Sequence, residues 1–131
     1  MKYKSKNHSK YFIMYHLIFV CKYRKKLLVK FGEELKDMIY YISDESDFSI
    51  IEMEVDKDHI HILVETEPKI SPLMIVRKLK QQTTWKLWNK HKVYLKKQFW
   101  AENTFWSDGY FCCSIGNVSK EIIEKYIQNQ G

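Results

Sequence analysis

The sequence has 131 residues, with 22 Lys and Arg against 16 Asp and Glu and a formal net charge of +6. This length predicts one domain over residues 1–131 with a substantial hydrophobic core. The cysteines are three in number and lack CxxC spacing, which argues against a disulfide framework and a structural zinc cluster and favours a reducing cytoplasm. The apolar run near the N-terminus is too short to span a bilayer, so no membrane association is expected.

The charges are segregated along the chain. Residues 1–32 carry nine Lys or Arg and no acid, residues 33–67 carry twelve acids and two lysines, and residues 68–100 carry nine Lys or Arg and no acid. Aromatic residues are interleaved with the second basic block, and such a surface suits nucleic acid, because charge holds the backbone while bases stack on rings. A solvated helix face followed by a lysine-rich loop is the alternative. The absence of acids from both blocks favours a polyanionic partner.

The first half of the chain predicts a strand, a helix and two further strands. Residues 11–21 are apolar on both faces, which is typical of a central strand covered on two sides. Apolar residues at i, i+3, i+4 and i+7 predict an amphipathic helix over about 31–46. Apolar and acidic residues alternate over 48–55, which indicates a half-buried strand, and a tight turn then leads into the strand within DKDHIHILVE.

The second half predicts two helices separated by a strand. Ser71 and Pro72 are N-cap and first-turn signals for a helix over about 72–90. A basic connection over 91–100 precedes a strand within FWSDGYFCCSI, and a last helix follows over about 118–130. The order β, α, β, β, α, β, α predicts an α+β fold of the ferredoxin-like, split βαβ kind, with helices on one face of an antiparallel sheet.

His59 and His61 are one residue apart in an apolar run. Side chains alternate along a strand, so both imidazoles should point to the same face. Neutral imidazole is a common ligand of divalent metals, and two from one rigid strand form half of a metal site. Two histidines on a partly exposed strand face, without a metal, are the alternative at this point.

The C-terminal segment offers a third ligand and a nucleophile. Ile122, Tyr126 and Gln130 are each four residues apart and would share one face of the last helix. A tyrosine on an apolar stripe is usually a core residue, but the Gln130 amide needs a polar partner, and its carbonyl oxygen can bind a hard divalent ion. If this helix packs across the histidine face, Gln130 completes a three-ligand site and Tyr126 stands one turn away. A metal that polarises a phosphate would compensate for the weak nucleophilicity of a phenol with a pKa of about 10.

At this point the chain resembles the small single-tyrosine HUH transposases of bacterial insertion sequences of the two-hundred/six-hundred-and-five group, over essentially its whole length. The resemblance rests on YHLIFVCKYRKKLL, DKDHIHILVE, LWNK and FWSDGYFCCSIGNVSKEIIEKYIQNQ, in the family's order and spacing. It implies that His59, His61 and Gln130 bind Mg²⁺ or Mn²⁺ and that Tyr126 is the nucleophile.

The resemblance also implies a reaction and partners. Tyr126 would attack a phosphodiester of single-stranded DNA and leave a 5′-phosphotyrosine link and a free 3′-hydroxyl, which later reverses the step without a nucleotide cofactor. The family implies a homodimer that joins its sheets, recognises terminal hairpins of its own element and often combines the histidines of one subunit with the tyrosine helix of the other. The candidates for holding the hairpin backbone are Arg24, Lys25, Lys26, Arg77, Lys78, Lys80 and Lys86.

Two other functions are compatible with the residues. A domesticated, non-catalytic protein that binds DNA hairpins would keep the basic and aromatic surface without the chemistry. A rolling-circle initiator or relaxase would nick DNA in a similar way, but those enzymes generally carry the tyrosine in a larger domain with added modules.

Overall fold

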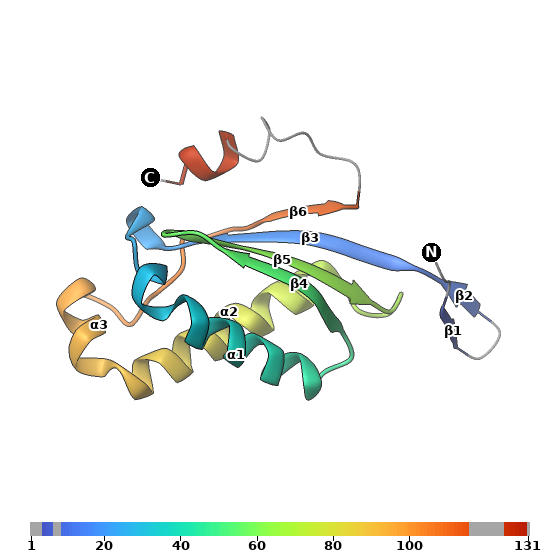
Figure 1. The fold of residues 1–131 in the computed structure, drawn as a ribbon, viewed down its shortest axis with the longest axis horizontal. Helices are drawn as coiled ribbons and strands as arrows, with labels where there is room; N and C mark the ends of the chain where they lie inside the picture. The colour runs from blue at the N-terminus through green and yellow to red at the C-terminus, as the bar shows by residue number, and fades with distance from the viewer. Residues whose placement is uncertain (1–3, 7–8, 116–124, 131) are drawn as a thin grey trace.

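The computed structural model describes residues 4–6, 9–115 and 125–130. The strands are β1 (Lys4–Lys6), β2 (Ser9–Tyr11), β3 (Ile13–Val20), β4 (Ser49–Val55), β5 (His59–Thr66) and β6 (Phe111–Ser114), and the helices are η1 (Lys22–Arg24), α1 (Leu28–Asp44), α2 (Pro72–Lys90) and α3 (Lys92–Gln98). Strands β3 to β6 form one layer, α1 and α2 lie along one side of it, and a short C-terminal helical turn lies on the other side (Figure 1).

The four-stranded sheet has the order β4-β5-β3-β6, and every neighbouring pair is antiparallel. Strand β3 is therefore central, as the apolar run predicts. The connection β3, α1, β4, β5, α2, β6 through this strand order is the split βαβ pattern, so the α+β prediction with helices on one face is confirmed. Strands β1 and β2 pair in a separate two-stranded sheet, which the sequence analysis did not predict.

Alternation along β5 separates a core face from a second face. Ile60, Ile62 and Val64 are fully buried and belong to one hydrophobic cluster with residues of α1 and α2. Helix α1 approaches the sheet closely at Gly32, where an added Cβ would lie 2.8 Å from a methyl group of Val55. The absence of a side chain at Gly32 thus lets the helix pack directly on β4.

The helix predicted over 72–90 coincides with α2. Its N-cap is Ser71, whose hydroxyl accepts a hydrogen bond of 3.2 Å from the Met74 N–H, and Pro72 opens the first turn. The sequence signals at this helix are local and strong, which explains the agreement. No helix in the described part of the chain has the length and apolar character needed to cross a membrane.

Other boundaries needed correction. Helix α1 begins at Leu28, three residues before the predicted start, and no side chain caps its N-terminus, so the sequence offered no start signal. The predicted connection over 91–100 instead contains α3, held by the buried Leu95. The predicted last helix, about 118–130, falls largely on 116–124, outside the described residues, and the structure describes residues 125–128 as helical.

Candidate active site

His59 and His61 share the face of β5 that points away from α1 and α2. Ile60 and Ile62 between and beside them point into the core, and the two imidazole centroids lie 5.1 Å apart. On the neighbouring strand β3, Val20 stands opposite His59 and Ile18 opposite His61. The prediction that the two histidines lie side by side is consistent with this geometry, and an apolar neighbour accompanies each.

Asp58 holds the His59 ring. Its carboxylate lies 2.7 Å from Nδ1 of His59 and accepts a second hydrogen bond of 3.2 Å from Nε of Arg24. Burial alone would raise the pKa of the Asp58 carboxyl, but the hydrogen bonds from His59 and Arg24 outweigh it and hold that pKa below its usual value. An ionised carboxylate can only accept, so Nδ1 of His59 is the donor in this contact, and in a neutral ring this leaves the lone pair on Nε2.

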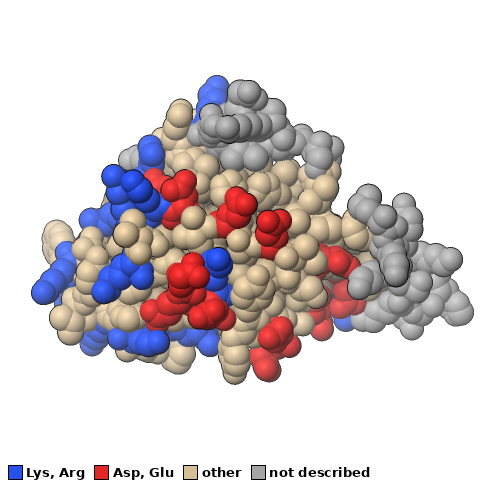
Figure 2. Space-filling model, viewed as in Figure 1, with Lys and Arg blue, Asp and Glu red and all other residues tan. Residues whose placement is uncertain are grey.

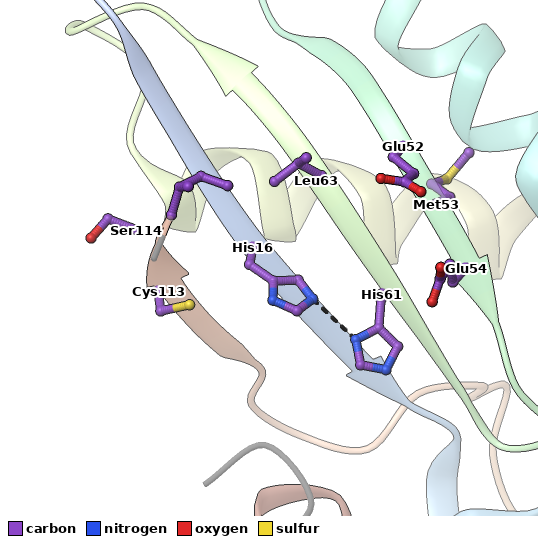
Figure 3. A pocket seen from close by; sticks show the side chains of 9 residues that line it. His16, Glu52, Met53, Glu54, His61, Leu63, Cys113 and Ser114 are labelled. Carbon is purple, nitrogen blue, oxygen red and sulfur yellow. Dashed lines mark hydrogen bonds between the residues drawn. The ribbon is translucent and has the colours of Figure 1, made fainter. Parts of the chain in front are cut away.

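His16 contacts the His61 ring. Its Nε2 atom lies 3.0 Å from Nδ1 of His61, and the rings are stacked with centroids 5.2 Å apart (Figure 3). Burial, followed by the neighbouring His59 and His16, lowers the pKa of His61 to about 4, and burial also lowers the pKa of His16. His61 is therefore neutral near pH 7, the form in which imidazole binds metals.

A hollow of about 290 Å³ opens beside this histidine pair (Figure 3). His16 and His61 come from the central strands β3 and β5, Glu52 and Glu54 from the edge strand β4, and Cys113 from the opposite edge strand β6. Glu54 stands directly opposite His61 on β4. The hollow thus combines two imidazoles with a nearby negative charge, which favours a cation over an anion next to the rings.

The two imidazoles of β5 fit a divalent metal in donor type and in support. Each Nδ1 is engaged, by Asp58 or by His16, and such outer contacts are typical of metal-binding histidines. No three His, Cys, Asp or Glu side chains within residues 4–6, 9–115 and 125–130 group closely enough to hold an ion. A metal on this face would therefore need a donor of another kind, such as a glutamine or a phosphate oxygen.

Tyr126 lies on the same side of the sheet, over the edge strand β6. Its ring packs on Phe111, with centroids 5.5 Å apart, and burial raises the pKa of its hydroxyl. Phe111 stands opposite Ile18, which stands opposite His61, so these three residues form a row across β6, β3 and β5. At about 4.8 Å per strand, Phe111 is roughly 10 Å from His61.

Gln130 closes the described C-terminal turn. Its backbone N–H donates to the Ile127 carbonyl at 3.1 Å. Within the described residues no hydrogen bond joins its side chain to His59 or His61. The structure thus brings the two histidines together and places Tyr126 on their side of the sheet, without assembling all four residues in one contact group.

The first basic candidates follow the end of β3. Lys26 is exposed, whereas Arg24 binds Asp58 and Lys25 lies 3.5 Å from the Gln98 amide oxygen and 5.7 Å from the Phe99 ring centroid. Tyr23 and Arg24 have positive φ angles of 60° and 52°, which is uncommon for residues other than glycine. This tight turn brings Arg24 to Asp58. Because Asp58 also contacts His59, the basic segment is linked to a candidate metal ligand.

The candidates on α2 differ from one another. Arg77 is exposed and Lys78 is partly exposed, and the Lys86 ammonium lies 4.4 Å from the Tyr41 ring centroid. Lys80 is directed inward, where its ammonium donates to the carbonyls of Ser107 and Gly109 and burial lowers its pKa to about 8. Lys80 thus has a structural task that Arg77 lacks.

Sequence reasoning missed His16 and Asp58 as parts of the site. His16 is a single polar residue in the apolar run YFIMYHLIFVC, and a lone histidine in a central strand is a signal for a specific polar partner. Asp58 directly precedes the histidine strand, where a carboxylate can reach the first imidazole. The partnership of His16 with His61 depends on the register of β3 and β5, which the sequence alone did not supply.

Comparisons with known proteins identify the family. The family model described as "Transposase IS200 like" matches residues 9–130. The chain belongs to this transposase family. It is 31% identical over 121 residues to the ISDra2 transposase TnpA of Deinococcus radiodurans, covering 92% of this chain and 85% of that protein. It is 29% identical over 130 residues to the transposase for insertion sequence element IS200 of Salmonella typhimurium, covering 97% and 82% of the two chains.

Two solved structures are similar to this transposase. A crystal structure of a Deinococcus radiodurans R1 protein assigned as a transposase superimposes with a TM-score of 0.88 at 26% identity, covering 97% of each chain. A REP-associated tyrosine transposase bound to a REP hairpin superimposes with a TM-score of 0.55 at 15% identity, covering 94% of this chain and 68% of the other. The second likeness shows a shared fold.

Proposed function

We propose that this transposase cleaves and rejoins single-stranded DNA at the ends of its insertion sequence through a 5′-phosphotyrosine link on Tyr126. The observation that carries the proposal is the pair of imidazoles of His59 and His61, each with its Nδ1 engaged, on the same sheet face as Tyr126. In the reaction, the Tyr126 oxygen forms a bond to phosphorus while the bond to the 3′-oxygen breaks. The released 3′-hydroxyl later reverses the exchange, so the number of phosphodiester bonds is conserved.

His59, His61 and Gln130 are the residues that would hold Mg²⁺ or Mn²⁺. Such an ion, when bound, polarises the phosphate and stabilises the charge that develops on its oxygens. The protein residues contribute positioning: Asp58 fixes the His59 ring, and the apolar Ile18 and Phe111 separate the histidines from the tyrosine. Because burial raises the pKa of Tyr126, the tyrosine needs such assistance to react at neutral pH.

A DNA hairpin is the proposed partner. One solved relative of this fold is bound to a REP hairpin, and the basic segments supply positive charge. Figure 2 shows Lys and Arg gathered where α3 and the start of α1 lie, with Asp and Glu across the middle of the molecule. Contacts from Arg24, Lys25, Lys26 and the α2 candidates Arg77, Lys78 and Lys86 would position the hairpin backbone, whereas Lys80 is engaged by the Ser107 and Gly109 carbonyls.

A homodimer formed by joining sheets is part of the proposal. Within one chain, Tyr126 packs over β6 whereas His61 lies on β5, two strands away. This separation supports an active site completed either by movement of the C-terminal turn or by the tyrosine of a partner subunit. Mixing two inactive variants, one lacking both histidines and one lacking Tyr126, would restore cleavage only if the partner supplies the tyrosine.

The proposal is tested by incubating the protein with single-stranded DNA from either flank of its gene and separating the products on a denaturing gel. We expect a covalent adduct that requires Mn²⁺ or Mg²⁺, disappears with chelator and is absent from Tyr126→Phe. That variant should still shift a hairpin on a native gel, because only the hydroxyl is removed. Hairpin binding without any adduct from the wild type would instead favour a non-catalytic hairpin-binding protein.

A further inference from the structure

His16 interrupts the run of apolar and aromatic residues in β3 and directly precedes its buried half. From Leu17 to Cys21 every residue of this segment is buried, with exposures of 2% or less. His16 is partly exposed, and its ring faces the hollow beside His61 (Figure 3). Packing alone would be served by an apolar side chain at this position, so a polar contact has to account for the imidazole.

The contact is directional. His16 stands opposite Leu63, whereas His61 stands opposite Ile18, so the two rings meet diagonally across neighbouring strands. Their planes are inclined by 30°, and the Nε2 to Nδ1 distance is 3.0 Å. This distance is that of an ordinary hydrogen bond, in which one nitrogen donates and the other accepts.

The direction of this hydrogen bond decides what His61 can bind. If Nδ1 of His61 donates, its Nε2 keeps a lone pair and can bind a cation. If Nε2 of His16 donates instead, Nε2 of His61 carries the proton and cannot bind a cation.

We propose that His16 is a positioning residue that accepts a hydrogen bond from the Nδ1–H of His61 and so fixes the tautomer whose Nε2 is free for a divalent cation. The inference rests on the proposed function in its metal-binding part, and it adds a residue to which that function assigned no role. Asp58 does the same for His59 with a carboxylate. The two imidazoles of β5 are thus held by different acceptors, one charged and one neutral.

The neutral acceptor has a chemical consequence. A carboxylate partner makes an imidazole more basic and more electron-rich, whereas an imidazole partner adds no charge. A proton on His59 or on His16 would place a positive charge beside His61. Using His16 rather than a second carboxylate orients His61 without adding a further negative charge to a face already close to Glu52 and Glu54.

The test compares His16→Phe, which keeps an aromatic ring against His61 but offers no acceptor, with His16→Gln, whose carbonyl oxygen can accept. Long-range ¹H–¹⁵N correlation spectra of the metal-free protein report which nitrogen of His61 carries the proton. Calorimetry with Mn²⁺ reports the affinity, and urea denaturation of both variants checks that the fold persists.

We expect the wild-type spectrum to show the proton of His61 on Nδ1. We expect His16→Phe to lose this preference and to bind Mn²⁺ about 10–100-fold more weakly, and His16→Gln to restore a substantial part of both properties. Rescue by glutamine is a result that a purely steric role of His16 would not give.

Two results would overturn the proposal: a His61 proton on Nε2 in the wild type, or the same tautomer and the same Mn²⁺ affinity in His16→Phe as in the wild type. If the wild type binds no Mn²⁺, the metal site of the proposed function fails. The spectra of the metal-free protein then still decide whether His16 orients His61, so the two failures are distinguishable.

Discussion

Strand β5 presents two faces of opposite character within eight residues. Ile60, Ile62 and Val64 are fully buried beneath the helices, whereas His59 and His61 point to the other side, where their partners are Asp58 and His16. The first face stabilises the fold by removing apolar surface from water. The second face holds the two imidazoles in fixed orientations. Because the side-chain period of a strand is two, neighbouring residues can serve these separate tasks.

The largest expected effect is on the histidine face. His61→Ala should lower Mn²⁺ affinity by more than about 100-fold, because losing a supporting partner alone costs about 10–100-fold. The free energy of unfolding should change little, since His61 is only partly buried. Calorimetry and urea denaturation measure the two quantities, and undiminished Mn²⁺ binding would remove His61 from the site.

The adjacent residue should behave in the opposite way. Ile62 is fully buried, so Ile62→Ala should lower the free energy of unfolding by about 2–5 kcal/mol. The folded fraction should bind Mn²⁺ with nearly wild-type affinity, because the substitution does not touch the histidine face. A large loss of affinity together with unchanged stability would show that the two faces are not separable.

A pair of cations on α2 extends the comparison to DNA binding. Lys80→Met removes donors to the Ser107 and Gly109 carbonyls and should cost about 1–2 kcal/mol of stability. Arg77 is exposed, so Arg77→Met should leave stability within about 0.5 kcal/mol. It should instead weaken hairpin binding and reduce the salt slope of log K by about 0.7–0.9. Fluorescence anisotropy over a salt series measures hairpin binding, and urea denaturation measures stability. Weaker binding without loss of stability in Lys80→Met, together with loss of stability in Arg77→Met, would contradict these assignments.

The two faces of β5 should also differ in their pH dependence. Burial lowers the pKa of folded His61 to about 4 from an ordinary value of 6.5, so between these values the unfolded chain binds more protons than the folded one. The contribution of neutral His61 to the unfolding free energy of the metal-free protein should therefore be fully present above pH 6.5 and should decrease as the pH falls towards 4. In His61→Phe the slope of the unfolding free energy against pH should be smaller over this window. The decrease should be at most the slope that the uptake of one proton on unfolding produces. Equal slopes in urea denaturation series of the two proteins would contradict the assignment.

Local patterns determined how much of the fold was predictable. The helix at 72–90 has a cap, a first-turn proline and an apolar stripe in its own sequence, and the alternation of the histidine strand is equally local. Helix α3 is seven residues long with Leu95 as its buried residue, too short for a periodic pattern to distinguish it from a basic loop. The segments that form β1 and β2 lack the apolar alternation that indicates strands.

Long-range contacts determined how much of the site was predictable. The choice of His59 and His61 required only the strand period. The partnership of His16 with His61 joins residues 45 positions apart and follows from the antiparallel register of β3 and β5, which hydrophobicity alone did not fix. The hydrogen bond from Arg24 to Asp58 depends on two positive φ angles at the turn after β3, a conformation that no residue type in KYRKK indicates.

The central claim is that the imidazoles of His59 and His61 present Nε2 atoms to one divalent ion on the face opposite the helices. The most direct measurement is an anomalous difference map from a crystal of the wild-type protein soaked in Mn²⁺. We predict a single strong peak at bonding distance from Nε2 of both His59 and His61, on the side of the sheet that carries Tyr126. A peak bonded to Nδ1 of either ring, a peak away from both histidines, or no peak in crystals grown near pH 7 would contradict the account.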